Sequence, residues 1–284
     1  MELFKIGVIV DSFRVGVKEG IIKAREVGAQ GIQVYATSGE MDPDNLTSAA
    51  RKEFLDRVHS NGLVVSALCG DLGGHGFSVQ EDNHWRIEKS KRIMELAKEL
   101  ETDVVTTHIG VVPEESNHPR WEILNLACEE LALFGDSIGA SFAIETGPEK
   151  AVTLRKFLDS LTARGVKVNF DPANLVMVVG DDPVMAVEQL ASYIVHTHAK
   201  DGVMLRKSSA EAVYNGTEDF SDSAPFREVP LGEGNVHFPT YLAALHRSGY
   251  NGFLTIEREV GDNPERDIRA AVSFLRDQMS KMTV

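Results

Sequence analysis

Four residues that could bind a metal ion stand at the ends of four strand-like runs of this chain. They are the last residues of SFAIE, VKVNFD, YIVHTH and GFLTIE, namely Glu145, Asp171, His198 and Glu257. Their spacings are 26, 27 and 59 residues. One strand and one helix account for each of the first two spacings, and the third leaves room for an extra segment. Consecutive strands of a closed barrel would bring the four side chains together at one end.

Such a cluster would need a positive charge among its members. A carboxylate at the end of one strand more often caps a helix or forms an ion pair, so a single such residue indicates little. Three carboxylates around one point, however, repel each other strongly unless a cation lies between them. The set therefore predicts a site for one divalent metal ion.

The seventh run continues as IVHTHAKD, with polar residues at every second position. Because neighbouring side chains on a strand point to opposite faces, we expect Ile194, His196, His198 and Lys200 to face inward. His196 would lie about 6–7 Å below His198 along the strand, where it fills a barrel layer or hydrogen-bonds a metal ligand. Lys200 is expected in the mouth, within reach of a substrate, unless it pairs with an acidic neighbour such as Asp201.

Eight strand-like runs alternate with helix-like stretches along the chain. The other four runs are KIGVIV, GIQVYA, VVSALC and DVVTTHI, and residues 84–100, 119–138 and 266–279 have the apolar spacing of amphipathic helices. Alternating strands and helices indicate parallel strands, and eight such units predict an α/β protein with one domain, a (β/α)8 TIM barrel over residues 1–284. A doubly wound sheet is disfavoured, because the first strand is not followed by G-x-G-x-x-G.

One segment is longer than a barrel crossover requires. Residues 207–237 lie between strands seven and eight and are rich in Ser, Gly, Asp and Glu. Long loops at the C-terminal face of a barrel commonly carry function. We therefore expect this insertion to form a partial lid, with an inert surface excursion as the alternative.

The composition narrows the classes of function. The chain has 43% apolar residues, a formal net charge of −14 and a pI near 5.1. This charge opposes binding to nucleic acid or to anionic lipid, which it would repel. Cys69 and Cys128 are too few for a disulfide framework, and no signal peptide or membrane-length apolar run is recognisable. We expect a cytoplasmic protein that binds neither nucleic acid nor membrane.

With these motifs the chain resembles the sugar isomerase/epimerase superfamily of xylose-isomerase-like TIM barrels. The resemblance covers essentially the whole chain and is densest in ETGPE, NFDPANL, HTHAKDG, EVPLGEGNV and LTIERE. It implies that the four ligands hold one Mn²⁺, Mg²⁺, Co²⁺ or Zn²⁺, and their mostly oxygen donors favour Mn²⁺ or Mg²⁺, with Mn²⁺ as the expected cofactor. It also implies that Glu145 and Glu257 are the catalytic acid and base, with a role as metal ligands alone as the alternative, and that a homodimer or homotetramer forms.

Five further residues are candidates for substrate binding: His108, Glu149, Asn174, Lys200 and Arg206. His108 ends the fourth strand facing inward, where a second-metal ligand or a hydrogen-bonded core histidine is the alternative. Glu149 resembles the family's second glutamate, which holds a substrate hydroxyl, although a charge at a helix N-terminus would have the same placement. Asn174 stands where many relatives have a histidine, which argues against several metals. Arg206 would reach in from the insertion unless it is a surface arginine.

The predicted function is a divalent-metal-dependent isomerase or epimerase of a sugar or sugar phosphate that acts through a metal-stabilised enediolate. The alternative is a lyase that dehydrates a keto-cyclitol, which would need an acid, His108 or His75, to expel the β-hydroxyl. A DNA-repair enzyme like endonuclease IV is less consistent with the sequence, because the further His and Asp ligands and the basic face that such an enzyme needs are missing. A non-catalytic sugar-binding or metal-storage barrel stays open. The expected partner is a small sugar or cyclitol.

Overall fold

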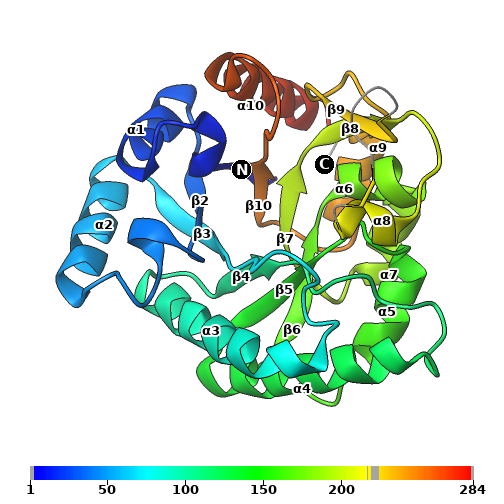
Figure 1. Ribbon diagram of the computed structural model, residues 1–284. Helices are drawn as coiled ribbons and strands as arrows, with labels where there is room; N and C mark the ends of the chain where they lie inside the picture. The colour runs from blue at the N-terminus through cyan, green and yellow to red at the C-terminus, as the bar shows by residue number, and fades with distance from the viewer. Residues whose placement is uncertain (1–2, 216, 219–223, 283–284) are drawn as a thin grey trace.

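Eight parallel strands close into a barrel that is surrounded by helices (Figure 1), in a computed structural model that describes residues 3–215, 217–218 and 224–282. The barrel strands are β1 (Lys5–Ile9), β2 (Gly31–Tyr35), β3 (Val64–Cys69), β4 (Val104–Thr107), β5 (Ser141–Glu145), β6 (Val166–Phe170), β7 (Ile194–Ala199) and β10 (Phe253–Ile256). Their order around the barrel is β1-β10-β7-β6-β5-β4-β3-β2, and β2 pairs with β1 to close it. The predicted (β/α)8 TIM barrel is confirmed, and all eight predicted strand runs contribute to it.

The helices begin and end at sequence signals that explain their bounds. Helix α4 starts with Pro119 after His118, whose Nδ1 accepts the N–H of Arg120, and it ends at Gly139 in the left-handed conformation (φ 67°). The helices are α1 (Val17–Val27), α2 (Ser48–Ser60), α3 (Gln80–Glu99), α4 (Pro119–Ile138), α5 (Ala151–Asp159), α6 (Pro172–Asn174), α7 (Pro183–Leu190), α8 (Ala210–Tyr214), α9 (Phe238–Arg247) and α10 (Pro264–Ser280), with short turns η1 (Val10–Phe13), η2 (Gly39–Met41) and the π-helical η3 (Leu175–Val179). Within the described residues, no helix combines the length and apolarity needed to cross a membrane.

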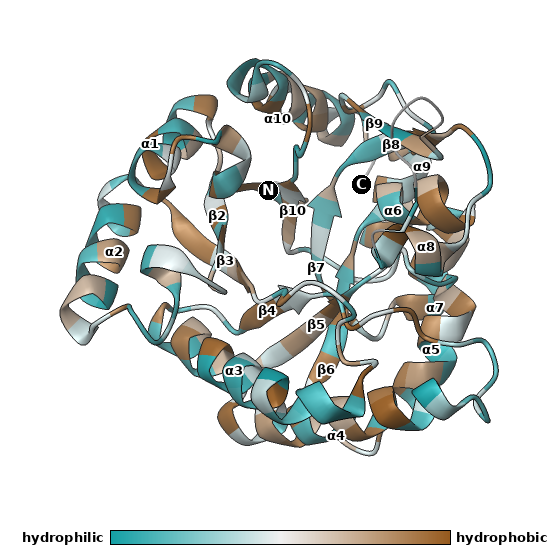
Figure 2. Ribbon diagram, in the orientation of Figure 1, coloured by the Kyte–Doolittle hydropathy of each residue, from teal (hydrophilic) through white to brown (hydrophobic). Residues whose placement is uncertain are grey.

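The main hydrophobic core lies between the barrel and the helices. Strand residues such as Phe142 and Leu254 pack there with helix residues such as Leu124 and Leu245, and all four are fully buried. Figure 2 shows β3 and β5 as largely hydrophobic ribbons, whereas the surrounding helices alternate between hydrophobic and hydrophilic residues. Burial of this apolar surface is the dominant favourable term in folding, and it fixes the strands that carry the site.

The barrel interior changes from apolar to polar toward the C-terminal ends of the strands. A small cluster of Ala67, Val104 and Ala143 fills its lower part. Further along β4 and β5 the residues with the same parity are Thr106 and Glu145, both buried. The polar side chains are therefore gathered at one end of the barrel, its C-terminal mouth.

Strand β7 contains an irregularity that strand parity could not predict. Val168 of β6 pairs with Ile194, but the next residue, Asn169, pairs with His196, so the register shifts by one residue. Such a bulge redirects side chains. Ile194 therefore packs against the outer core, and Val195 packs against the small cluster inside the barrel. The expected inward direction of Ile194 was wrong, whereas the alternation resumes from His196 onward.

The insertion between β7 and β10 contains regular elements where only a loop was expected. Strands β8 (Asp201–Met204) and β9 (Phe226–Val229) form a two-stranded antiparallel sheet, and α8 lies between them in the chain. The Asp201 carboxylate accepts hydrogen bonds from four backbone N–H groups, those of Gly202, Gly232, Gly234 and Val236. One buried side chain thus holds together the two ends of the insertion, which begins at Asp201 rather than at 207. Residues 216 and 219–223 of the predicted segment lie outside the described residues.

A buried ion-pair network fastens β9 to the barrel. Arg258, just after β10, lies 2.6 Å from a carboxylate oxygen of Glu228 on β9 and 3.1 Å from one of Asp267 on α10. The three side chains are at most 10% exposed. The network joins the insertion, the last barrel strand and the last helix.

Candidate functional site

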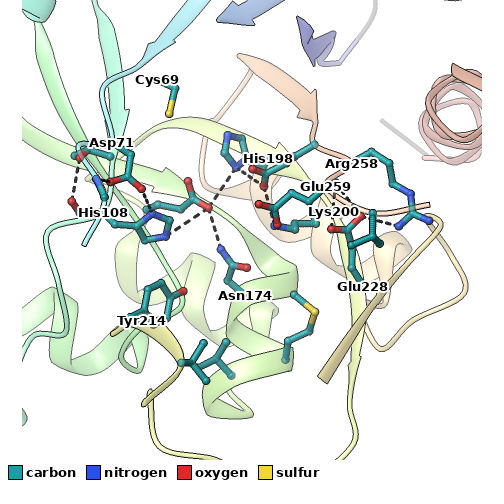
Figure 3. Close-up of a pocket in the computed structure, with 18 of the residues that line it drawn as sticks. Cys69, Asp71, His108, Asn174, His198, Lys200, Tyr214, Glu228, Arg258 and Glu259 are labelled. Carbon is teal, nitrogen blue, oxygen red and sulfur yellow. Dashed lines mark hydrogen bonds and ion pairs between the residues drawn. The ribbon is translucent and has the colours of Figure 1, made fainter. Parts of the chain in front are cut away.

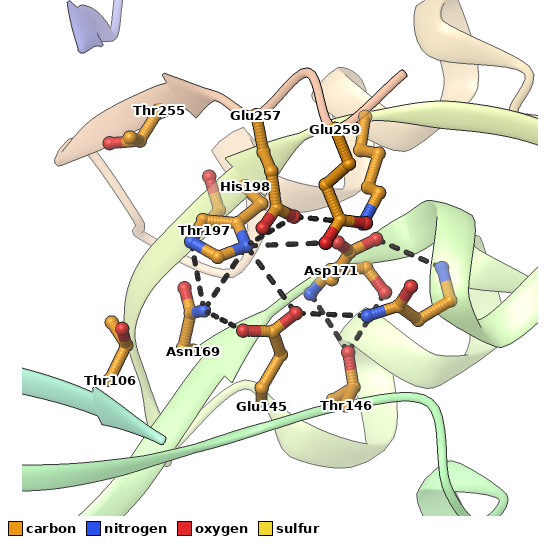
Figure 4. Close-up of polar contacts among 12 residues, drawn as sticks. Thr106, Glu145, Thr146, Asn169, Asp171, Thr197, His198, Thr255, Glu257 and Glu259 are labelled. Atoms are coloured by element: carbon orange, nitrogen blue, oxygen red, sulfur yellow. Dashed lines mark hydrogen bonds and ion pairs between the residues drawn. The ribbon is translucent and has the colours of Figure 1, made fainter. Parts of the chain in front are cut away.

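Four acidic and imidazole side chains meet at the mouth of the barrel (Figure 4). Each offers one ligand atom, and these atoms all lie within 4.8 Å of one another in the set Glu145, Asp171, His198 and Glu257. Nδ1 of His198 lies 3.2 Å from Glu257, 3.5 Å from Glu145 and 3.7 Å from Asp171. All four residues are buried. The structure therefore brings together the four residues that the spacing singles out.

Asp171 shows that this cluster fits a cation. Its Oδ1 accepts the backbone N–H of Asn174 at 2.9 Å, while its Oδ2 is buried without a hydrogen-bond partner among the described residues. Burial raises the pKa of Asp171, although His198 and Lys200 oppose this shift. A divalent ion between the four side chains would bind Oδ2 and balance the carboxylates. The donor set and the free oxygen therefore suit such an ion.

His198 is oriented by a residue that sequence reasoning missed. Its Nε2 hydrogen-bonds Oε1 of Gln33 on β2 at 3.2 Å, and the amide nitrogen of Gln33 donates to Oγ1 of Thr106 at 3.0 Å. A neutral His198 that donates from Nε2 turns the lone pair of Nδ1 toward the carboxylates. Metal-binding histidines usually donate their other N–H in this way. The available signal was a glutamine in the apolar run GIQVYA.

The charges of the cluster balance one another only in part. Burial lowers the pKa of His198, but Glu145 and Glu257 outweigh this and hold the pKa well above its usual value. For Glu257, burial raises the pKa, but the positive charges of Lys200 and His198 outweigh burial and hold the pKa well below its usual range. Glu257 is therefore a carboxylate at neutral pH. A metal ion that binds His198 would displace its proton.

His196 supports the cluster from below through Asn169. The Thr255 hydroxyl donates to Nε2 of His196 at 2.9 Å, Nδ1 of His196 donates to Oδ1 of Asn169 at 2.8 Å, and Asn169 donates to Oε2 of Glu145 at 3.1 Å. Burial lowers the pKa of His196 well below its usual value, so the ring is neutral as this pattern requires. His196 was expected to hydrogen-bond a metal ligand directly or to fill a barrel layer. It contacts the ligand Glu145 indirectly, through Asn169.

Asn174 completes the contacts of Glu145. Its Nδ2 donates to Oε1 of Glu145 at 2.9 Å. The approach depends on Gly147, whose φ is +132° and where an added Cβ would lie 2.3 Å from the Cβ of Asn174. The two asparagines, Asn169 and Asn174, therefore hold both carboxylate oxygens of Glu145 in place.

Lys200 lies beside the cluster and is almost fully buried. Its Nζ is 3.0 Å from Oε2 of Glu257 and 2.6 Å from Oε2 of Glu259, so its partners are these two glutamates and not Asp201. Burial lowers the pKa of Lys200, but Glu257 and Glu259 hold it well above its usual value. Lys200 therefore presents a fixed ammonium group at the mouth.

His108 forms a dyad with Asp71, which follows β3. Nδ1 of His108 lies 3.0 Å from Oδ2 of Asp71, while its Nε2 is buried without a hydrogen-bond partner among the described residues, 3.8 Å from Glu145. Burial lowers the pKa of His108, but Glu145 and Asp71 outweigh this and raise it to about 9. The ring of Tyr214 on α8 lies over His108, with centroids 5.2 Å apart (Figure 3). The dyad places a protonated donor next to the cluster.

Three residues of the cluster, Glu145, His198 and Glu257, line a cavity of about 700 Å³ at the barrel mouth (Figure 3), whereas Asp171 lies outside its described lining. Three predicted substrate-binding residues belong to its lining, namely His108, Asn174 and Lys200. Tyr214 from the insertion also lines it, and so does Asp71, neither of which sequence reasoning identified. Its volume falls within the range of about 300–1,000 Å³ that is typical of small-molecule sites.

The other two predicted substrate-binding residues lie outside the described lining. Arg206 pairs with Glu218 of the insertion at 2.5 Å, and 39% of its side chain is exposed. Glu149 is buried, and its Oε2 accepts the backbone N–H of Val112 at 3.0 Å. A contact between either residue and a substrate in the cavity would need a different side-chain position.

Glu149 should make the stability of the protein depend on pH. Burial raises its pKa to about 8 from an ordinary value of 4.5. The unfolded chain loses this proton first as the pH rises, so the contribution of Glu149 to the free energy of unfolding is full below about pH 4.5 and falls up to about pH 8. Glu149→Gln should therefore raise the melting temperature relative to the wild type more at pH 8 than at pH 5. An equal difference at both pH values would contradict this, and Glu122→Gln on the exposed face of α4 is the control.

Comparison with known proteins places this site in a family. A sequence profile described as xylose isomerase-like TIM barrel matches residues 21–278. The chain belongs to this family. Among curated proteins, the uncharacterized protein YfiH of Bacillus subtilis strain 168 is 24% identical over 270 residues, which cover 83% of this chain and 84% of YfiH.

Several solved structures superpose on nearly the whole chain. A xylose isomerase domain protein from Planctomyces limnophilus is 26% identical, with a TM-score of 0.80 over 98% of this chain and 97% of that one. A D-tagatose 3-epimerase-like protein is 18% identical, with a TM-score of 0.74 over 98% and 97%. The probable 3-DHS dehydratase AsbF of Bacillus anthracis is 20% identical, with a TM-score of 0.72 over 96% and 99%. The last two likenesses establish a shared fold.

Proposed function

We propose that the protein is a divalent-metal-dependent isomerase or epimerase of a sugar or cyclitol. The observation that carries the proposal is the buried four-ligand cluster beside a cavity of about 700 Å³, with Oδ2 of Asp171 lacking a hydrogen-bond partner among the described residues. The epimerase-like protein among the structural neighbours is consistent with this reaction class. Glu145, Asp171, His198 and Glu257 are the proposed ligands.

The metal proposed for this site is Mn²⁺, because three carboxylates and one imidazole are mostly hard oxygen donors. Mg²⁺, Co²⁺ and Zn²⁺ are the other candidates. A cation bound there would polarise the carbonyl group of a substrate and lower the pKa of the adjacent C–H.

Two glutamates are the proposed proton carriers. Glu145 enters the site from β5 and Glu257 from the end of β10, strands that are not neighbours in the barrel. One carboxylate would take the proton from the carbon next to the carbonyl, and the other would return it to the opposite face. Asn174 and Lys200, which line the cavity beside these glutamates, would hold substrate hydroxyl groups.

The insertion is the proposed lid of this site. Helix α8 brings Tyr214 over His108, and β9 brings Phe226 to the cavity lining. The network around Arg258 fastens β9 to the barrel. A lid that covers the site would exclude water from a substrate carbanion.

A dehydratase is the second candidate, and the Asp71–His108 dyad favours it. Nε2 of His108, which has no hydrogen-bond partner among the described residues, faces the cluster and would donate a proton to a departing β-hydroxyl group. Asp71 would hold the ring in the donating orientation, as carboxylates do for catalytic histidines. The probable dehydratase AsbF shares the fold.

Solvent exchange of a substrate hydrogen tests the proposal. We expect the Mn²⁺-loaded protein, incubated in D₂O with a panel of ketoses, their phosphates and inososes, to place deuterium at the carbon next to the carbonyl in one of them, with an epimer or isomer as product by NMR. A dehydrated product would favour the second candidate. An epimer or isomer that retains its hydrogen would contradict proton transfer by the glutamates and point to a hydride shift.

A further inference from the structure

One side of the cavity is apolar although the ligand cluster is strongly polar. The apolar wall consists of five residues from three elements, namely Met177 and Val178 of η3, Val213 and Tyr214 of α8, and Phe226 of β9. Both α8 and β9 contact η3, so the five residues form one continuous surface. In Figure 1, α8 and β9 lie on the same side of the barrel as α6, which directly precedes η3 in the chain. Three of the five residues come from the insertion.

The apolar wall is built into the fold. Met177 and Val178 are buried, and the close approach of Met177 depends on Gly202 of β8, where an added Cβ would lie 2.2 Å from the methionine sulfur. The π-helical turn that carries Met177 directly follows Asn174, which hydrogen-bonds Glu145. The apolar wall is therefore continuous with the ligand cluster along the chain and in the cavity.

The cavity is larger than a bare hexose requires. Cavities of about 300–1,000 Å³ enclose most of a drug-sized ligand, and this one has a volume of about 700 Å³. A hexose is smaller than such a ligand, and its hydroxyl groups would gain nothing from the apolar wall. A substrate that fills the cavity needs a polar part at the ligand cluster and an apolar part at the wall.

The charges of the lining disfavour a phosphate group. Five carboxylates line the cavity, those of Asp71, Glu145, Glu228, Glu257 and Glu259. The Lys200 ammonium is already paired with two of them, and the Arg258 guanidinium is paired with a third. Arg227 also belongs to the lining but is exposed, on β9. His108 is likewise paired with Asp71, so a phosphate ester within the cavity would compete with these carboxylates for cations that they already hold.

We propose that the substrate is an unphosphorylated keto sugar or keto-cyclitol that carries an aromatic substituent, as in an aryl glycoside with a ketone on its sugar ring, and that the aromatic substituent lies against the apolar wall. This inference rests on the proposed function and extends it to the class of substrate. The sugar ring would lie at the ligand cluster, and the insertion would recognise the substituent. Aromatic groups bury a large apolar area and pack well against methionine, valine and other rings.

Binding of three probes to the Mn²⁺-loaded full chain tests the proposal. The probes are 4-nitrophenyl β-D-glucopyranoside, methyl β-D-glucopyranoside and glucose 6-phosphate, and the measured quantity is Kd by calorimetry. We expect the aryl glycoside to bind at least about tenfold more tightly than the methyl glycoside, because the ring buries apolar area. Glucose 6-phosphate should bind most weakly. Equal Kd values for the two glycosides, or tightest binding of the phosphate, would overturn the proposal.

Two single substitutions from different elements locate the substituent. Phe226→Ala on β9 and Val213→Ala on α8 should each weaken binding of the aryl glycoside several-fold and leave the Kd of the methyl glycoside unchanged. Leu205→Ala is the matched control, because Leu205 belongs to the same insertion, is 56% exposed and lies outside the described cavity lining. An aryl preference that survives in both variants, each shown by circular dichroism to be folded, would overturn the placement at the wall.

The same titration separates this inference from the proposed function. Solvent exchange with a bare ketose or sugar phosphate, together with equal binding of the two glycosides, would refute the inference and leave the isomerase proposal standing. An aryl preference in a protein that catalyses no exchange would support the apolar subsite and count against the isomerase proposal.

Discussion

Asp171→Asn should abolish stable binding of the divalent metal ion. Asparagine retains Oδ1, which accepts the N–H of Asn174, and replaces only Oδ2, the buried oxygen that points into the cluster and has no hydrogen-bond partner in the described part of the chain. The substitution thus removes one negative charge and places N–H donors where a cation requires a lone pair. After saturation with Mn²⁺ and desalting, we expect about one ion per wild-type chain and almost none in the variant. Inductively coupled plasma mass spectrometry measures the metal content of each protein.

A matched control distinguishes the loss of a ligand from the loss of a helix cap. Asp182 caps α7 through Oδ1, which accepts the N–H of Val184, and it lies outside the ligand cluster. Asp182→Asn should therefore retain the metal. Gln33→Leu, which removes the partner of His198, should weaken binding by about 10–100-fold without abolishing it. Full metal occupancy in Asp171→Asn would show that the cluster is not the metal site.

Arg258→Ala should destabilise the folded protein by about 3–5 kcal/mol, the usual effect of removing one partner from a buried ion pair. The substitution leaves the buried carboxylate of Glu228 without its paired arginine, and leaves that of Asp267 with only the exposed Arg266. Burial already raises the pKa of Glu228, and Lys200 and Arg258 oppose this shift. The free energy of unfolding from urea titration measures the effect.

The control for this experiment is a second arginine that contacts the same aspartate. Arg266 also contacts Asp267, at 3.2 Å, but 73% of its side chain is exposed. Exposed pairs contribute about 0–1 kcal/mol, so Arg266→Ala should change the free energy of unfolding by less than about 1 kcal/mol. Similar losses in the two variants would show that burial of the Arg258 network does not determine its contribution.

The sequence predicts the ligand cluster well because barrel geometry converts spacing into position. Each strand of a barrel ends at the same face, so regular spacing from Glu145 to Asp171 to His198 was sufficient to place these residues together. The partners beneath them were harder to predict. Gln33 stands out as a polar residue in an apolar run, but its bond to His198 joins residues 165 positions apart, and no local pattern reveals it.

Predictions failed where a side chain's direction depends on distant pairing. The bulge in β7, which turned Ile194 outward, arises from the register with β6 and leaves no local signal. Strands β8 and β9 are short and separated by more than twenty residues, so their pairing could not be recognised from alternation. Glu149 and Arg206 lie in segments where strand parity does not apply. Their placement outside the described cavity lining followed only from the structure.

The closure of the insertion by Asp201 has an evolutionary consequence. One carboxylate ties the start of the segment to Gly232, Gly234 and Val236 near its end, so the barrel meets the insertion at a fixed joint. Residues between these points can then change in length and composition while the joint, and the barrel below it, keep their geometry. The protein is in this sense modular. Substitutions within this segment alone would then be enough to change which compounds the protein binds. The same joint is where an insertion from a related protein would be joined to this barrel in a designed chimera.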